Sequence, residues 1–199
     1  MKVELVRYTH DPIEAAGRAG GVCYDKEEKE DYGKFIMGIV RRGHESVIEH
    51  VVFTFRIEGV SRACTHQLVR HRIASYSQRS QRYVDEGEFD YVIPPSIEGS
   101  EEAKKEFEET MDFLIKKYEQ LKEMGVSKED ARFVLPNACT TTIVATFNAR
   151  SLRNFFKVRL EKHAQWEIRT LAGKMYDLVR EVAPALFEDL QTLRDTSSP

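Results

Sequence analysis

The chain has 199 residues, of which 41% are hydrophobic and 32% are charged, and its formal net charge is −3 at pH 7. This balance is typical of a globular protein and argues against a disordered or fibrous chain. The length predicts a single domain over residues 1–199, with a single unit of two lobes as the alternative. The sequence has no apolar run of about 18 residues and no N-terminal secretory pattern, so we expect a cytoplasmic protein that does not insert into a membrane.

The pattern of apolar residues predicts a mixture of helices and strands. Asp11 and Pro12 have the chemistry of a helix start, and Gly43 has that of a helix end. Residues 50–57 alternate in hydrophobicity, which indicates a half-buried strand. In chain order we expect a strand at 2–7, helices at 12–19 and 30–42, a strand at 50–57, a helix after Ser61 to about 69, a polar loop to about 82, a long helix at 101–124, a strand at 140–147, helices at 151–161 and 166–182, and a short helix after Pro184.

Neither the cysteines nor the glycines form a known ligand motif. Cys23, Cys64 and Cys139 are widely spaced and make no CxxC pair or zinc-type cluster, so we interpret them as reduced and structural and expect no metal site. No glycine-rich phosphate loop of the GxGxxG or Walker type occurs. Phosphates would therefore have to be held by side chains, a role that suits the planar guanidinium group of arginine.

Charge is segregated along the chain in a way that the net value hides. Residues 61–84 contain five arginines and no acid, and residues 131–160 contain four arginines, one lysine and no acid. The intervening residues 85–130 hold fifteen acids and six lysines. Two basic segments in a mildly acidic protein predict an anion site built from distant parts of the sequence, with a small polyanion as ligand, rather than a nucleic-acid surface.

The most informative segment is residues 70–83, which interleave four arginines with serines and two glutamines. Such a segment can satisfy many phosphate and carbonyl oxygens at once, which indicates a nucleotide-binding cradle. Residue chemistry alone leaves two other interpretations open, a solvated basic loop and an arginine–serine segment that contacts RNA.

The same segment resembles a known family. Arg70, His71 and Arg72 are followed, after seven residues, by Ser80, and this spacing matches the RHR-x7-S signature of the flavin-dependent thymidylate synthases, the ThyX family. Four further blocks resemble that family in the same order, at residues 43–50, 131–136, 147–152 and 163–167. The resemblance therefore extends over most of the chain.

The resemblance implies a fold, an activity and an assembly. The implied fold is α+β, with a central and mainly antiparallel β-sheet flanked by helices. The implied enzyme is a methyltransferase of dTMP biosynthesis that converts dUMP to dTMP, with methylenetetrahydrofolate as carbon donor, FAD as hydride carrier and NADPH as reductant. The family also implies a homotetramer with active sites at subunit interfaces, and no nucleic-acid partner is expected.

The resemblance also assigns residues to two ligands. The residues implied to contact FAD are Ser46, Arg70, His71, Arg72, Gln78, Asn148, Arg150 and Asn154. The residues implied to line the dUMP pocket are Gln67, Arg70, Gln78, Arg79, Ser80, Arg82, Arg132 and Arg159. Arg159 falls where the family has an arginine proposed to ionise N3 of uracil, so it is the implied catalytic residue. Some relatives carry glutamate at position 78, and a role that needs a charge there does not transfer to Gln78.

Helical geometry adds a separate argument about Arg159. In a helix over residues 151–161, Arg159 lies near Phe155 on an apolar face, and a buried arginine needs an anionic partner. Arg159 also points about 180° away from Arg150, at 100° per residue. Because the two arginines lie on opposite faces, the helix should contact a different neighbour on each face, which suits a helix between two binding surfaces. The alternative is that Arg159 forms a structural ion pair.

The sequence also limits the mechanism. The cysteines lie outside the matching blocks, so we expect no covalent thiolate, and Ser80 has no evident partner base and is assigned to binding. Arginines around the uracil ring would favour its anionic form. Two alternatives stay open, an RNA-binding module that uses residues 70–82 and a flavin protein of the same fold without synthase activity.

Overall fold

The computed structural model describes residues 1–25 and 28–197. Within them, no helix is both long enough and apolar enough to cross a membrane. Its elements, in chain order, are β1 (Lys2–Tyr8), α1 (Pro12–Val22), α2 (Tyr32–Arg41), the 3-10 helix η1 (Glu45–His50), β2 (Val52–Ser61), α3 (Arg62–Leu68), β3 (Ala74–Gln78), α4 (Pro95–Glu98), α5 (Glu101–Glu123), α6 (Lys128–Ala131), η2 (Arg132–Val134), β4 (Thr140–Asn148), α7 (Ala149–Arg159), α8 (Trp166–Val182), α9 (Pro184–Phe187), η3 (Glu188–Leu190) and α10 (Gln191–Ser197).

The chain divides into two compact units, each built from segments that are distant in sequence. Unit 1 contains Met1–Ile57, Gln67–Ser77 and Val144–Pro199, and unit 2 contains Glu58–His66 and Gln78–Ile143. Strands β2, β3 and β4 and helix α3 each contribute residues to both units. The two units are described separately below.

Four strands form one sheet in the order β1-β2-β4-β3. Backbone hydrogen bonds join Thr9 to Val52 and Ala149 to Val51, so the ends of β1 and β4 both meet the start of β2. Neighbouring strands that meet end to start run antiparallel. The expected α+β fold with a central antiparallel sheet and flanking helices is confirmed.

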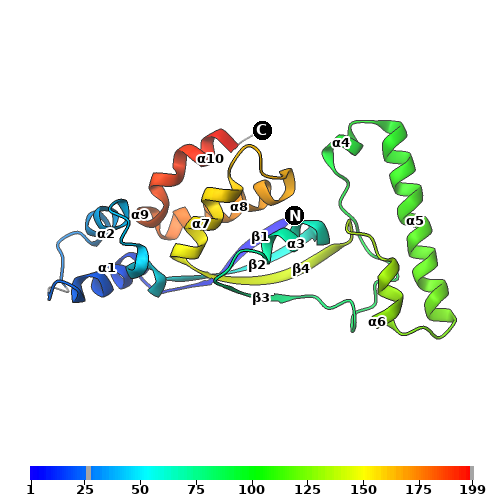
Figure 1. Ribbon diagram of the computed structural model, residues 1–199, viewed down its shortest axis with the longest axis horizontal. Helices are drawn as coiled ribbons and strands as arrows, with labels where there is room; N and C mark the ends of the chain where they lie inside the picture. Colours follow the sequence, from blue (N-terminus) through cyan, green and yellow to red (C-terminus); the bar gives the residue numbers. More distant parts are fainter. Residues whose placement is uncertain (26–27, 198–199) are drawn as a thin grey trace. The chain divides into compact units, whose positions relative to one another are not determined.

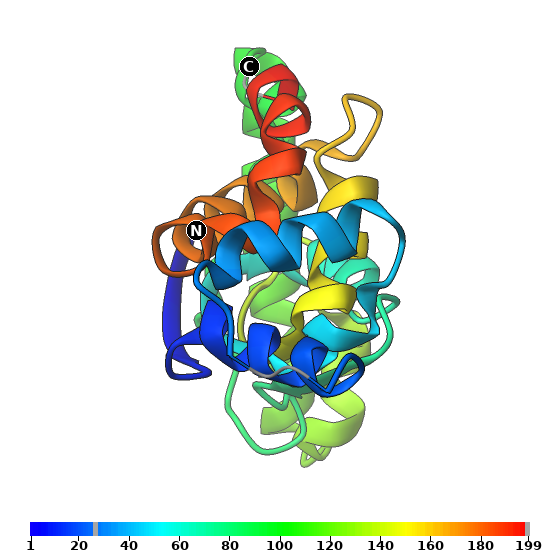
Figure 2. The same ribbon diagram turned by 90° about the vertical axis from the view of Figure 1, so that its left-hand side faces the viewer.

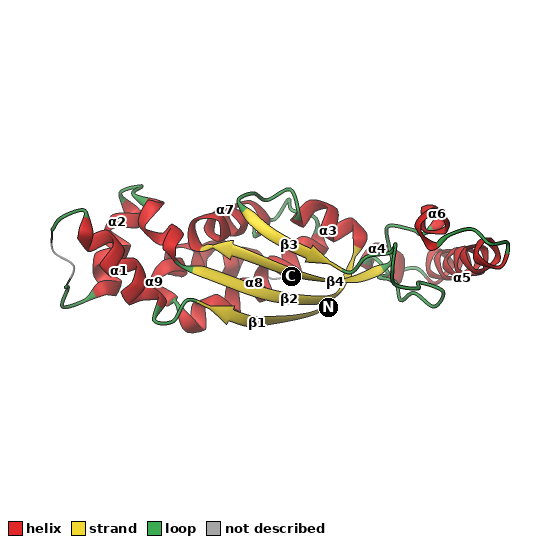
Figure 3. Ribbon diagram, turned by 90° about the horizontal axis from the view of Figure 1, so that it is seen from below, coloured by secondary structure: helices red, strands yellow, loops and turns green. Residues whose placement is uncertain are grey.

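One face of the sheet in unit 1 is buried against helices. Phe53 of β2 and Phe147 of β4 are almost fully buried. The Phe53 ring lies 5.7 Å from that of Phe187, and the Phe147 ring lies 5.8 Å from that of Phe155 on α7. Figure 1 shows α7 and α8 above the sheet, and Figure 3 shows both helices behind it. Strand β2 thus has the buried face that the alternation over residues 50–57 predicts.

Helices α1 and α2 pack against each other in unit 1 and face the viewer in Figure 2. Pro12 begins α1 as predicted, and Asp11 occupies the N-cap position but makes no side-chain capping bond. Asp31 does cap α2, by accepting a hydrogen bond from the backbone N–H of its first turn at 2.9 Å. The close contact of the two helices depends on Gly17, because a Cβ atom there would lie 2.3 Å from Tyr32 Cδ1.

The main departure from the predicted elements is β3. Residues up to about 82 were expected to form a polar loop, but Ala74–Gln78 form an edge strand beside β4. The segment offers a short alternation of serines around Tyr76, without the β-branched residues that mark most strands. Its pairing partner lies more than sixty residues away in the sequence, so tertiary contacts decide its conformation.

Unit 2 has a small hydrophobic core of its own. Phe89, Met111 and Cys139 are buried together. Tyr91 pairs with Cys139 in an isolated antiparallel bridge, and its ring lies 5.9 Å from that of Phe107 on α5. This core holds the apolar side of the long helix predicted over residues 101–124.

Candidate active site

Helix α7 carries predicted site residues at both of its ends. Asn148 is its N-cap, with Oδ1 accepting a hydrogen bond from the Ser151 backbone at 2.8 Å. Arg150 in the first turn is exposed and donates to Glu49 Oε1 at 2.6 Å. Arg159 lies in the last turn, about 13 Å further along the helix axis at 1.5 Å per residue.

The turn between α3 and β3 carries Arg70, His71 and Arg72. The hydroxyl of Tyr76 on β3 lies 2.9 Å from the Leu68 carbonyl oxygen and 2.8 Å from that of His71. Burial raises the pKa of Tyr76, so this hydroxyl stays protonated and can donate. Strand β3 therefore holds the backbone of the turn, while the Arg70 and Arg72 side chains are exposed.

Three predicted residues meet through hydrogen bonds in unit 1. Arg159 Nε donates to His71 Nε2 at 2.8 Å, and Arg159 Nη1 donates to Gln67 Oε1 at 3.3 Å. The His71 ring packs edge-on against Phe155, with centroids 4.9 Å apart. Because Nε2 accepts a hydrogen bond, the proton of the neutral ring resides on Nδ1.

His71 is a neutral acceptor at physiological pH. Burial, and then the neighbouring charge of Arg159, lower the pKa of His71 from 6.5 to about 4. A protonated ring could not accept from Arg159, and it would place two positive charges in contact. The geometry and the lowered pKa therefore agree on one protonation state.

The surroundings of Arg159 differ from the sequence expectation. Arg159 is only partly buried, and the groups that accept its hydrogen bonds are the neutral side chains of His71 and Gln67 rather than an anion. Arg159 is therefore less buried than expected, and no ion pair of Arg159 is found among the described residues, so the alternative of a structural ion pair has no support there. An arginine with neutral neighbours keeps its full positive charge for a ligand.

The buried arginine of α7 is Arg153, which the sequence analysis did not single out. Its side chain is 2% exposed and donates to both carboxylate oxygens of Asp189, at 2.7 and 2.6 Å. Leu152 precedes it and Phe156 follows three residues later, so helical spacing already placed Arg153 beside the apolar face.

A second carboxylate connects this arginine to η1. Glu45 Oε1 lies 3.5 Å from Arg153 Nε and 3.4 Å from Lys157 Nζ. Arg150 Nε lies 3.8 Å from the other carboxylate oxygen of Glu45. Three basic side chains of α7 therefore converge on the residue that precedes Ser46.

Gln78, the last residue of β3, and Arg79 belong to unit 2 and form their hydrogen bonds within it. Gln78 Nε2 donates to Thr65 Oγ1 at 2.9 Å. The Arg79 N–H donates to the Thr142 carbonyl at 2.9 Å, and the Arg79 carbonyl accepts from Arg62 Nη2 at 2.8 Å. The amide of Gln78 is thus engaged inside the protein, and Arg79 is fixed by its backbone.

The other basic residues predicted for the nucleotide in unit 2 meet at Glu129. Arg82 Nε and Nη2 lie 2.8 and 3.1 Å from its two carboxylate oxygens. Arg132 Nε donates to the Glu129 backbone carbonyl at 3.0 Å. Ser80 Oγ accepts from the Arg82 N–H at 3.2 Å. The Arg82 ion pair is exposed and contributes about 0–1 kcal/mol, so an anionic ligand can displace it.

The predicted residues therefore fall into separate groups. Those in unit 1 are Ser46, Gln67, Arg70, His71, Arg72, Asn148, Arg150, Asn154 and Arg159, and those in unit 2 are Gln78, Arg79, Ser80, Arg82 and Arg132. Exposed polar side chains of the FAD set in unit 1 are Ser46, Arg70, Arg72, Arg150 and Asn154. Three guanidinium groups with polar neighbours fit a ligand that carries phosphates, as FAD does.

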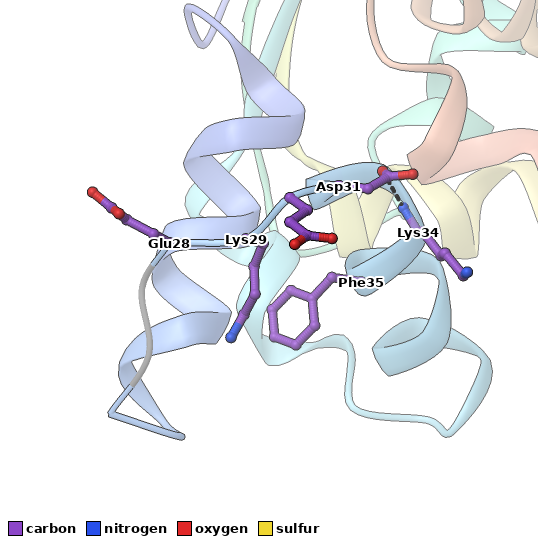
Figure 4. A pocket seen from close by; sticks show the side chains of 6 residues that line it. Glu28, Lys29, Asp31, Lys34 and Phe35 are labelled. Atoms are coloured by element: carbon purple, nitrogen blue, oxygen red, sulfur yellow. Dashed lines mark hydrogen bonds between the residues drawn. The ribbon is translucent and has the colours of Figure 1, made fainter.

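A separate cavity of about 870 Å³ lies around the start of α2 (Figure 4). It is lined by Glu28, Lys29, Glu30, Asp31, Lys34 and Phe35. Lys29 Nζ lies 4.6 Å from the centroid of the Phe35 ring. The lining has mixed charge and includes none of the residues assigned to FAD or dUMP, so we do not place the predicted site there.

Most of the chain is similar in sequence to known proteins. Residues 4–185 match the family model described as "Thymidylate synthase complementing protein". The chain is 48% identical to the flavin-dependent thymidylate synthase of Geobacter sulfurreducens, over 95% of this chain and 86% of that protein. It is 47% identical to the enzyme of the same name from Nitratidesulfovibrio vulgaris, over 94% and 85%. Identity to that of Clostridium tetani is 46%, over 94% and 86%.

The matched region includes most of unit 1 and the whole of unit 2. The chain belongs to the flavin-dependent thymidylate synthase family. The family predicted from the RHR-x7-S spacing and the four accompanying blocks is thus confirmed.

Proposed function

We propose that this chain methylates dUMP to dTMP with methylenetetrahydrofolate as carbon donor, bound FAD as hydride carrier and NADPH as reductant. The observation that carries the proposal is the family match over residues 4–185, with identities of 46–48% to relatives named for this activity. The neutral partners of Arg159 support it further, because they leave a positive charge available to an anionic ligand.

Most of the residues that we propose to bind FAD lie in unit 1. FAD supplies a hydride acceptor and donor, which the side chains of this protein lack. Arg70, Arg72 and Arg150 are exposed and bind phosphate oxygens, and Ser46 and Asn154 supply polar contacts. His71 lies in the same turn as Arg70 and Arg72, Asn148 caps α7, and Gln78 completes the assigned set.

The residues that we propose to bind dUMP come from both arginine-rich segments, residues 61–84 and residues 131–160. Arg79, Arg82 and Arg132 neutralise the phosphate, with Arg70, Ser80 and Gln78 as further donors. Gln67 and Arg159 contact the base. Arg159 stabilises negative charge on the uracil ring, an interaction typically worth about 3 kcal/mol when the donor is preorganised.

The assembly and the cellular setting follow from the same family. We propose that the chain functions as one domain, that four chains form a homotetramer, and that each active site takes residues from more than one subunit. We also propose that the enzyme acts in the cytoplasm, where its nucleotide, folate and NADPH substrates occur.

The test begins with the visible absorption spectrum of the purified protein after incubation with FAD and gel filtration. We expect a bound-flavin spectrum that bleaches on addition of NADPH, and dTMP formation when dUMP and methylenetetrahydrofolate follow. A folded, colourless protein would overturn the proposal, and steeply salt-dependent RNA binding by it would support the RNA-binding interpretation of residues 70–82 instead.

A further inference from the structure

Glu86 is a buried carboxylate to which the family resemblance assigns no role. It lies in unit 2, four residues after Arg82, and is 3% exposed. Its Oε1 atom is fully buried and accepts no hydrogen bond from the described residues. A buried charge is costly unless opposite charges surround it, so its neighbours explain why it is there.

Two arginines provide those opposite charges. Arg79 Nε lies 3.7 Å from Glu86 Oε1, too far for a hydrogen bond but close enough for an ion pair. Burial lowers the pKa of Arg62, while the charge of Glu86 opposes that effect, so the carboxylate also stabilises the Arg62 cation. Arg62 Nε is itself buried and, within the part of the chain that the structure describes, has no hydrogen-bond partner.

Arg62 connects this pair to the backbone of the nucleotide segment. Its Nη2 donates to the Arg79 carbonyl at 2.8 Å, while its own N–H donates to the Cys139 carbonyl at 2.9 Å. The Arg79 N–H donates to the Thr142 carbonyl at 2.9 Å. Arg79 is therefore held by its N–H, its carbonyl and the Nε edge of its side chain.

The arginines around Glu86 carry like charges, and Glu86 is their buried acidic neighbour. The charges of Arg132 and Arg79 both disfavour the charged form of Arg62. Burial raises the pKa of Glu86 and Asp85 adds to that effect, while the charges of Arg79 and Arg62 oppose it and favour the carboxylate. The adjacent Cys139 thiol is neutral, because burial raises its pKa to about 12. Glu86 is thus the buried counter-charge of an arginine cluster.

We infer that Glu86 and Arg62 are positioning residues that hold Arg79, and with it the segment from Gln78 to Arg82, in the conformation that binds the nucleotide phosphate. The inference rests on the proposed function, which assigns that segment to dUMP. Arg79 keeps 42% of its side chain exposed while its Nε atom lies 3.7 Å from Glu86 Oε1. A guanidinium group held at one edge presents the other to a phosphate with little loss of entropy on binding.

The first measurement compares steady-state kinetics of the FAD-loaded enzyme with those of Glu86→Gln, which keeps the shape but removes the charge. Without the counter-charge the arginines separate, so we expect the KM for dUMP to rise roughly tenfold, with kcat and the flavin spectrum unchanged. The matched control is Glu88→Gln, because Glu88 is exposed two residues further on. Arg62→Lys keeps the charge but loses the guanidinium geometry, and should also raise the KM.

The second measurement does not depend on activity. Hydrogen exchange at the Arg79 N–H should be faster in Glu86→Gln than in the wild type or Glu88→Gln, because its bond to Thr142 opens more often. A wild type without flavin or dTMP formation would overturn the proposed function, while faster exchange would still support the positioning role. Unchanged exchange at the Arg79 N–H together with an unchanged or lower KM for dUMP would overturn the positioning role of Glu86. A lower KM would mean that Glu86 competes with the dUMP phosphate for Arg79.

Discussion

At the scale of single residues, the protonation state of His71 determines what Arg159 can do. A neutral ring accepts the Nε hydrogen of Arg159 and fixes the plane of its guanidinium group, and the acceptors of Arg159 among the described residues carry no opposing charge. The edge contact with Phe155 sets the ring orientation. Orientation and charge of the proposed catalytic arginine therefore depend on a histidine that is kept from protonation.

This dependence predicts an unusual titration. The His71 ring protons should shift in NMR spectra with a pKa of about 4, compared with 6.5 for an unperturbed histidine. Because the folded pKa is the lower one, the unfolded chain binds more protons between these values. The contribution of His71 to the free energy of unfolding therefore increases as the pH rises from about 4 to about 6.5. His71→Asn identifies the signal.

Arg159→Met separates the two causes of the lowered pKa. Burial is the larger cause and remains in the variant, so the pKa of His71 should rise only part of the way to its ordinary value. A wild-type pKa near 6.5 would contradict this account of the contact, and a full return in the variant would show that charge, rather than burial, dominates.

At the scale of elements, the anchoring of α7 depends on Arg153. Arg153→Met leaves Asp189 without its bidentate partner, and we expect the free energy of unfolding to fall by about 3 kcal/mol in urea denaturation of the apoprotein. The control is Arg150→Met on the same helix, where the ion pair with Glu49 is exposed and screened by solvent, so its loss should have a much smaller effect on the free energy of unfolding. Equal losses in the two variants would contradict the role of burial.

The contact between α1 and α2 gives a second prediction at this scale, with two glycines as a matched pair. A Cβ atom at Gly17 would overlap the Tyr32 ring, so Gly17→Ala should lower the free energy of unfolding by about 1–3 kcal/mol. At Gly38 an added Cβ atom would have no neighbour within 4 Å. Gly38→Ala should therefore raise the free energy of unfolding by about 0.5–1 kcal/mol, because alanine has the higher helix propensity. Thermal denaturation distinguishes these opposite signs.

Elements with a strong local pattern could be predicted from the sequence. The alternation in residues 50–57 predicted the buried face of β2, and Ser61 caps α3 as expected, with its Oγ accepting from the Cys64 N–H at 3.0 Å. Strand β3 could not be predicted, because its hydrogen bonds come from β4, far along the chain. Arg153 had the spacing of a buried residue, but its partner Asp189 lies 36 residues away and no local pattern connects them.

At the scale of the whole molecule, the proposed dUMP residues come from both units of the chain. Gln67 and Arg159 belong to unit 1, and Arg79, Arg82 and Arg132 belong to unit 2. Within unit 1, Arg159 bonds to residues of its own chain, and within unit 2, Arg132 bonds to Glu129. A homotetramer in which one subunit supplies Arg159 and a neighbour supplies Arg132 to each active site would combine these groups.

Mixed oligomers test that arrangement. Arg132→Ala and Arg159→Ala should each abolish most dTMP formation alone, since each removes a proposed dUMP contact. If the two arginines of one site come from different subunits, random reassembly of an equal mixture restores about one quarter of the sites to the wild-type pair. If both come from one subunit, every site keeps one substitution and no activity returns. Unmixed homotetramers would also give no recovery. The control is therefore co-purification of differently tagged subunits, which must show in the same sample that the subunits have exchanged.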